Sequence, residues 1–178
     1  LILIGGGPGG VFSFFYAARK RLNTLLILAE WGGQSIVSET IYNWIGSSSI
    51  GGAELAINFQ KHVMANAKTK ENPDSTLEVK EGEKVKLISK NEDNTFNVTT
   101  ENDTVFQAKT ILISTGSGRR KLEAKNADRL EHKGLTYCAS CDGPLFSSMD
   151  VVVAGGGNAG FESSSQLLAY CLSLIHIS

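Results

Sequence analysis

The same glycine-rich turn occurs twice in this chain, and each copy directly follows a short apolar segment. Residues 5–10 read GGGPGG after residues 1–4, and residues 155–160 read GGGNAG after residues 151–154. A strand, a G-x-G-x-x-G turn and a helix together begin a βαβ unit that binds a dinucleotide. Two copies restrict the fold to an α/β protein with two Rossmann-like units, each built on a parallel sheet.

The hydrophobic pattern around the first turn fits one parallel α/β unit. Residues 1–4 are all apolar, which is typical of a strand buried on both faces. A helix is expected over residues 10–21, and a second strand over residues 24–28. Residues 53–66 predict an amphipathic helix, whose apolar stripe consists of Leu55, Phe59 and Val63.

Between residues 77 and 113 the apolar period changes to two, which is typical of strands with one buried face. Phe96 and Val98, for example, alternate with polar residues, and turn-forming clusters separate the apolar runs. This pattern predicts a small antiparallel meander inserted into the first unit. Residues 110–114 are then expected to return to the parallel sheet.

The two turns divide the chain into a first domain over residues 1–116 and the start of a second over residues 117–171. Residues 172–178 (LSLIHIS) depart from the preceding amphipathic helix and resemble a translated transposase sequencing adapter. We interpret them as an artefact, the alternative being an ordinary strand that begins at Leu172. The second unit is therefore expected to be truncated, and a few residues are expected to precede Leu1.

Composition argues against several classes of protein. The net charge of −1, with both signs interspersed, does not favour a nucleic acid or an anionic membrane as a partner. No apolar run approaches the roughly 20 residues of a membrane-spanning helix, so we expect no membrane association. The chain has three cysteines, two of them in one C-x-x-C, which indicates a redox pair in a cytoplasmic protein rather than a secreted disulfide framework.

Each glycine of the first turn has a separate role in such a site. Gly5 permits a tight strand-to-helix turn, Gly7 lets a pyrophosphate approach the backbone, and Gly10 allows the helix to pack closely on the strand. The helix N-terminus offers free N–H groups and the positive end of its dipole to the phosphates. Glu30, at the end of the second strand, is placed to accept a hydrogen bond from a ribose hydroxyl. The alternative is a turn that packs without a ligand, with Glu30 merely closing a strand at the surface.

Residues 138–143 (CASCDG) lie between the two glycine turns. Their spacing allows Cys138 and Cys141 to cycle between dithiol and disulfide, and the first turn of a helix favours the reactive thiolate through its dipole. Asp142 is a candidate acid and base for the thiol proton, the alternative being a carboxylate that caps a helix or turn. A dithiol between two dinucleotide sites describes an electron path from nicotinamide through flavin to the disulfide and an outside acceptor.

Half of a zinc site is the other interpretation of a C-x-x-C, but zinc needs a second cysteine pair or two suitably spaced histidines. His62 and His132 are isolated in the sequence, and Cys171 is most simply a small apolar residue of a helix. We therefore expect no metal site.

Taken together, these motifs resemble the N-terminal half of low-molecular-weight thioredoxin reductases, class II of the pyridine nucleotide–disulfide oxidoreductase superfamily. The resemblance covers residues 1–171. It rests on segments in the same order as in the family, namely residues 5–10, 31–34 (WGGQ), 42–46 (YNWIG), 114–116 (STG), 138–143 and 155–160.

The resemblance implies that the first unit binds FAD and the second NADPH. Gly33, Gln34 and Asn43 would lie near the flavin, and Thr115 with Gly116 would close over the cofactor. The full set of expected cofactor contacts is Gly5, Gly7, Pro8, Gly9, Gly10, Glu30, Gly33, Gln34, Asn43, Thr115 and Gly116 for FAD, and Gly155, Gly157, Asn158, Ala159 and Gly160 for NADPH.

The resemblance also implies roles for the dithiol. Cys141 would face the flavin, Cys138 would attack the disulfide of thioredoxin or a similar protein, and Asp142 would donate and accept protons. The parent protein would be a homodimeric thioredoxin-disulfide reductase that uses NADPH, the preference for NADPH coming from the family alone.

Other functions are open at this point. Residues 143–146 (GPLF) resemble the flavoprotein of alkyl hydroperoxide reductase as much as thioredoxin reductase. The remaining alternatives are an FAD/NAD(P)H oxidase or ferredoxin-linked flavin disulfide reductase of similar architecture, and a non-catalytic flavin-binding or regulatory protein. The C-x-x-C argues against the non-catalytic protein. Phe12, Phe14 and Phe15 depart from the family, which commonly has small residues at these helix positions.

Overall fold

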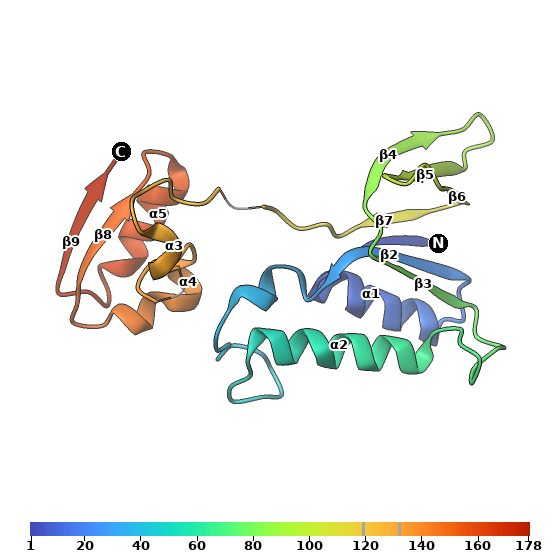
Figure 1. Ribbon diagram of the computed structural model, residues 1–178, viewed down its shortest axis with the longest axis horizontal. Coiled ribbons are helices and arrows are strands. Elements are labelled where there is room, and N and C mark those ends of the chain that lie inside the picture. The colour runs from blue at the N-terminus through green and yellow to red at the C-terminus, as the bar shows by residue number, and fades with distance from the viewer. Residues whose placement is uncertain (119, 132) are drawn as a thin grey trace. The chain divides into compact units, whose positions relative to one another are not determined.

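The computed structural model describes residues 1–118, 120–131 and 133–178, and the chain divides into two compact units (Figure 1). The first unit covers Leu1–Gly118, and the second covers the rest of the chain. His132, which entered the argument about zinc, lies outside the described residues.

The first unit combines parallel strands, two long helices and an antiparallel insertion. Its elements in chain order are β1 (Ile2–Gly6), α1 (Pro8–Arg19), β2 (Thr24–Trp31), the 3₁₀ helix η1 (Gly33–Val37), α2 (Gly52–Asn66), β3 (Leu77–Glu81), β4 (Val85–Lys90), β5 (Phe96–Thr100), β6 (Val105–Ala108) and β7 (Ile111–Ile113).

A parallel sheet in the strand order β3-β2-β1-β7 forms the centre of the first unit. The central strand β1 is buried on both faces, as its apolar sequence predicted. Leu3 packs against the helices α1 and α2, whereas Ile2 and Ile4 pack against the antiparallel sheet β4-β5-β6. Successive side chains of a strand point to opposite faces, so one apolar strand supplies both cores. Figure 1 shows the helices on one side of the sheet and the antiparallel strands on the other.

The predicted amphipathic helix is confirmed, since α2 buries Leu55, Phe59 and Val63. The predicted start of the meander at residue 77 is wrong. Residues of β3 pair in parallel with β2, Leu77 opposite Thr24, and the antiparallel sheet contains only β4, β5 and β6. β3 is an edge strand whose alternate residues are exposed, so its sequence has the period of two that also characterises a meander.

The phenylalanines of α1 pack within the first unit. Phe14 is fully buried in the core beneath the sheet. The ring centroid of Phe15 lies 3.9 Å from that of His62 on α2, and that of Phe12 lies 5.8 Å from that of Trp44. Phe12 and Phe15 therefore contact α2 and the loop before it, whereas Phe14 belongs to the core.

Truncating Phe14 to alanine is expected to lower the free energy of unfolding by about 3–5 kcal/mol, because it leaves a cavity in the core. Phe12, on the same helix, is 51% exposed and supplies the matched control. Phe12→Ala should cost less than about 1.5 kcal/mol, since only half of its apolar surface is buried. Denaturant titration of the full-length protein measures both losses, and equal losses would contradict the assignment of Phe14 to the core.

The second unit is smaller and contains one parallel strand pair. Its elements in chain order are α3 (Ala127–Leu130), α4 (Ala139–Asp142), the 3₁₀ helix η2 (Gly143–Phe146), β8 (Asp150–Ala154), α5 (Asn158–Leu167) and β9 (Ser173–Ile177).

β8, α5 and β9 form a βαβ unit in which the strands pair in parallel, Asp150 opposite Ser173. The helix ends at Leu167 rather than near Cys171, because the chain then turns, with the N–H of Tyr170 donating to the carbonyl of Leu167 at 2.9 Å. The strand β9 corresponds to the alternative given above for the last residues. Their interpretation as an adapter artefact stays a prediction.

Two parallel sheets, with an antiparallel insertion in the first unit, confirm the predicted fold class. None of the helices in the described part of the chain is both long and apolar enough to cross a membrane. Within the same residues, the side chains of His, Cys, Asp and Glu form no group of three or more that could hold a metal ion.

Candidate functional site

The first glycine turn has a geometry that only glycine can adopt. Gly5 has a φ of +119°, and a Cβ on it would lie 2.3 Å from the carbonyl oxygen of Ser114 on the neighbouring chain segment. A Cβ on Gly10 would lie 1.9 Å from the carbonyl oxygen of Gly5. These are the tight turn and the close helix–strand packing that the sequence predicted, and any side chain at either position would force the backbone apart.

Gly7 differs from these two glycines because a Cβ on it would make only ordinary contacts. It precedes α1 in an extended conformation, and no side chain caps the helix. The nearest atom to a Cβ on Gly7 would be the Cα of Gly33, at 3.8 Å, which is an ordinary van der Waals distance. Pro8 occupies the first turn of the helix. An uncapped helix N-terminus with an unobstructed backbone fits the pyrophosphate of a dinucleotide.

Other predicted FAD contacts lie at the carboxyl ends of the central strands. Glu30 is exposed near the end of β2, and Thr115 and Gly116 are exposed just after β7. Gly33 has a φ of +51°, and a Cβ on it would lie 3.1 Å from the Cα of Gly7, so the loop after β2 passes close to the first turn. Strand ends of a parallel sheet are the usual place for a nucleotide.

Gln34 and Asn43 are exposed on the segment that follows β2. Gln34 belongs to η1, directly after Gly33. Asn43 lies in a loop closed by a backbone bridge between Ile41 and Ile50. The structure thus brings Gly33 to the first turn, while the roles of Gln34 and Asn43 stay predictions.

The second glycine turn repeats the first. Gly155 has a φ of +133°, and a Cβ on Gly160 would lie 1.9 Å from the carbonyl oxygen of Gly155. Gly157 precedes α5 in an extended conformation without a side-chain cap, and no atom lies within 4 Å of its Cβ position. Asn158 and Ala159 begin the helix and are exposed. Both turns therefore share the positive φ of the first glycine, the close approach of the last glycine and an uncapped helix start.

The dithiol of the second unit is oxidised to a disulfide between Cys138 and Cys141, whose Cα atoms are 5.3 Å apart. Cys138 is half-buried and precedes α4, whereas Cys141 lies in α4 and is exposed. The N–H of Cys141 donates to the Sγ of Cys138 at 3.2 Å. Because α4 is only four residues long, the helix dipole is weaker than the sequence argument assumed.

Residues 138–142 form a turn, here named the dithiol turn, and Asp142 at its end is hydrogen-bonded to Cys138 at its start. Its backbone N–H donates to the carbonyl of Cys138 at 2.9 Å, and its carboxylate accepts a hydrogen bond from the hydroxyl of Thr136. The side chain makes no capping hydrogen bond to η2, the 3₁₀ helix that follows it. Asp142, which directly follows Cys141 in the chain, is therefore half-buried, and Thr136 is the donor to its carboxylate.

The dithiol turn is also hydrogen-bonded to α5, the helix that follows the second glycine turn. The hydroxyl of Ser140 donates to the Oε1 of Gln166 on α5 at 2.8 Å. Gly143 is buried, and a Cβ on it would lie 3.3 Å from the ring of Tyr170. The disulfide thus lies in the same unit as the second glycine turn.

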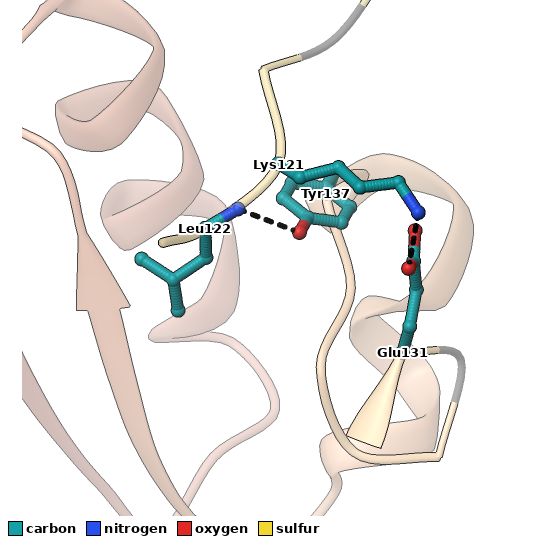
Figure 2. Close-up of polar contacts among 4 residues, drawn as sticks. All are labelled: Lys121, Leu122, Glu131 and Tyr137. Atoms are coloured by element: carbon teal, nitrogen blue, oxygen red, sulfur yellow. Dashed lines mark hydrogen bonds and ion pairs between the residues drawn. The ribbon is translucent and has the colours of Figure 1, made fainter. Parts of the chain in front are cut away.

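Figure 2 shows how the chain before the dithiol is tied together in the second unit. The N–H of Leu122 donates to the hydroxyl oxygen of Tyr137, the residue before Cys138, at 2.9 Å. The Nζ of Lys121 lies 2.7 Å from the Oε2 of Glu131, and this hydrogen bond raises the pKa of Lys121. Exposed ion pairs add little stability, so the main consequence is that Lys121 stays next to Glu131 and Leu122 next to Tyr137.

Sequence analysis missed Thr136, Tyr137 and Gln166. Each contacts the dithiol segment or the chain beside it through a side-chain hydrogen bond across a turn or between separate elements. A lone threonine, tyrosine or glutamine carries no spacing signal, so only the folded chain identifies these contacts.

A groove of about 960 Å³ lies between α1 and α2. Its walls include the aromatic rings of Phe12, Phe15, Trp44 and Phe59. These side chains come from the two helices and the loop before α2, not from the glycine turns. The groove is therefore separate from the predicted cofactor contacts.

Comparison with known proteins places these features in a family. The family profile described as pyridine nucleotide-disulphide oxidoreductase matches residues 1–177. An alkyl hydroperoxide reductase component of Staphylococcus epidermidis is 36% identical over 167 residues, which cover 94% of this chain and 31% of that protein. An NADH dehydrogenase of Bacillus subtilis is 32% identical over the same shares of the two chains.

Solved structures give the same picture. Thioredoxin reductase from Streptococcus pyogenes superposes with a TM-score of 0.83 at 30% identity, over 99% of this chain and 54% of that one. Thioredoxin reductase from Giardia duodenalis, at 24% identity, shares the fold with the same TM-score. The chain spans about a third of the length of the curated relatives and about half of that of the solved structures.

Proposed function

Because the chain belongs to the pyridine nucleotide-disulphide oxidoreductase family, we propose that its full-length protein passes electrons from NADPH through FAD to the disulfide of thioredoxin or a similar protein. The observation that supports this most directly is the Cys138–Cys141 disulfide in a unit that also contains a dinucleotide turn. The bond between Ser140 and Gln166 holds the two features together. This arrangement suits a redox-active disulfide.

The two turns would hold the two cofactors. Gly5, Gly7 and Gly10 give the first turn the shape and open face that a pyrophosphate needs, and exposed Glu30 is available to a ribose hydroxyl. The second turn has the same shape, and we assign NADPH to it. Bound FAD would supply a carrier that accepts two electrons from nicotinamide and gives them to a disulfide.

The chain's own residues would carry out thiol–disulfide exchange once the dithiol is reduced. The thiolate of Cys138 attacks one sulfur of the substrate disulfide, that S–S bond breaks, and a mixed disulfide forms. The thiolate of Cys141 then attacks Cys138, restores the Cys138–Cys141 disulfide and releases the second substrate thiol. Two electrons and two protons pass to the substrate, and Asp142 would carry a proton to or from the sulfurs.

The second candidate function is that of the flavoprotein in an alkyl hydroperoxide reductase. The 36% identity to the S. epidermidis relative and the sequence GPLF after Asp142 favour it. The dithiol chemistry would be the same, and the electron acceptor would belong to a peroxide-reducing system instead. NADPH-dependent turnover of the full-length protein with thioredoxin, compared with turnover in a hydroperoxide-coupled assay, decides between the two.

We further propose that the full-length protein is a cytoplasmic homodimer.

The glycine turns provide a paired test of cofactor binding. Gly7→Ala should weaken FAD binding at least about 10-fold, because the added methyl group occupies the face that would receive the pyrophosphate. Gly157→Ala places the same methyl group on the second turn, so it should leave FAD bound and weaken NADPH binding instead. Neither methyl group meets a protein atom closer than 3.8 Å, so both variants should fold.

Flavin absorbance of the purified full-length variants and titration with NADPH measure these two affinities. A wild-type protein that stays colourless with added FAD would refute the assignment of the first turn. Loss of FAD in both variants would show that the two turns do not have separate cofactors.

A further inference from the structure

The side chain of Thr136 contacts both ends of the dithiol turn, Cys138 and Asp142. Its hydroxyl oxygen lies 3.4 Å from the backbone nitrogen of Cys138 and within hydrogen-bond distance of the Oδ2 of Asp142. Thr136, Cys138 and Asp142 are all half-buried. One hydroxyl thus contacts both the first residue of the cysteine pair and the carboxylate that follows the pair.

The chemistry of the groups fixes the direction of both bonds. A backbone N–H only donates, and an ionised carboxylate only accepts, whereas a threonine hydroxyl donates one hydrogen and accepts others. The hydroxyl of Thr136 therefore accepts from Cys138 and donates to Asp142. Without this donor the carboxylate would be free to rotate about the side-chain bonds of Asp142. The other hydrogen bond that Asp142 makes to the turn uses its backbone N–H and does not involve the carboxylate.

We infer that Thr136 is a positioning residue, which holds the carboxylate of Asp142 at the cysteine pair so that it can exchange a proton with the sulfurs. This inference rests on the proposed function. Thr136 itself neither gains nor loses a proton in the exchange. It acts by limiting the orientations of Asp142, and a correctly oriented acid or base transfers a proton more often than a rotating one.

A purely structural role is the competing explanation, because the two hydrogen bonds also close the turn. The two explanations differ in how substitutions combine. A residue that acts through Asp142 loses its effect once Asp142 can no longer exchange a proton, whereas a residue that only stabilises the turn keeps its effect.

The test uses the full-length, FAD-loaded protein with NADPH and the coloured probe dithiobis(nitrobenzoate) as the disulfide. Thr136→Val removes the hydroxyl at nearly constant shape, and Thr136→Ser keeps it. We expect Thr136→Val to lower kcat about 10-fold with KM unchanged, and Thr136→Ser to stay within about two-fold of wild type. Added to Asp142→Asn, Thr136→Val should lower kcat by less than about two-fold further.

Alkylation of the reduced thiols by iodoacetamide at about pH 10, where thiols are ionised, measures access to the sulfurs without proton transfer. All variants should react there at the wild-type rate. Wild-type turnover in Thr136→Val, a Thr136→Ser variant as slow as Thr136→Val, or an equal loss in both Asp142 backgrounds would overturn the positioning role. A wild-type protein that alkylates normally but reduces neither the probe nor thioredoxin would instead reject the proposed function, and the positioning role with it.

Discussion

Replacing Cys138 by serine is expected to lower the rate of disulfide reduction by more than about 10³-fold. A serine hydroxyl is not ionised near neutral pH, so it cannot replace the thiolate that attacks a disulfide. Bleaching of the flavin absorbance by NADPH should continue, because this readout does not require the dithiol. Stopped-flow absorbance of the full-length variant follows both events in one sample.

The chain offers a matched control for this substitution. Cys171 is a free, half-buried cysteine in the same unit, and Cys171→Ser should reduce disulfides at close to the wild-type rate. Wild-type turnover in Cys138→Ser, or an equal loss in Cys171→Ser, would contradict the role proposed for the pair.

The order in which the two cysteines act is a separate question. In this structure Cys141 is the more exposed of the two, whereas the family resemblance assigns attack on the substrate to Cys138. Cys141→Ser keeps Cys138 and should therefore form a mixed disulfide with dithiobis(nitrobenzoate) faster than Cys138→Ser does. The opposite order of rates would exchange the roles of the two sulfurs.

Asp142→Asn is expected to slow turnover by about 10²- to 10⁴-fold while cofactor binding stays nearly unchanged. The structure makes this substitution a clean one. The side-chain oxygen of asparagine can still accept the hydrogen bond from Thr136, and the backbone bond to Cys138 is untouched, so the turn should keep its shape. The substitution replaces the carboxyl group, which can gain and lose a proton, with an amide, which cannot serve as this acid or base.

Turnover over a range of pH with both the probe disulfide and thioredoxin measures this loss. A rate within about two-fold of wild type at every pH would show that the carboxylate only stabilises the turn. Asp150→Asn serves as the control, because the carboxylate of Asp150 accepts a hydrogen bond from Ser173 at the end of the strand pair β8–β9 and lies outside the dithiol turn. It should leave turnover close to wild type.

The sequence alone determined the features that depend on neighbouring residues. The positive φ of Gly5 and the close approach of Gly10 follow from the motif, because only a residue without Cβ allows that turn. The buried stripe of α2 follows from its helical period, and the two buried faces of β1 from its unbroken apolar run. The spacing of Cys138 and Cys141 already placed the sulfurs within bonding reach.

Tertiary structure decided what depends on residues from different elements. β3 joined the parallel sheet because β2 offered an unpaired edge, which no local pattern of β3 could indicate. The contact of Thr136 with Asp142 and that of Ser140 with Gln166 exist only because turns bring these side chains together. Periodicity reports which face of an element is buried, but a hydrogen bond between two elements depends on where both lie in the fold, and that is set by packing over the whole unit.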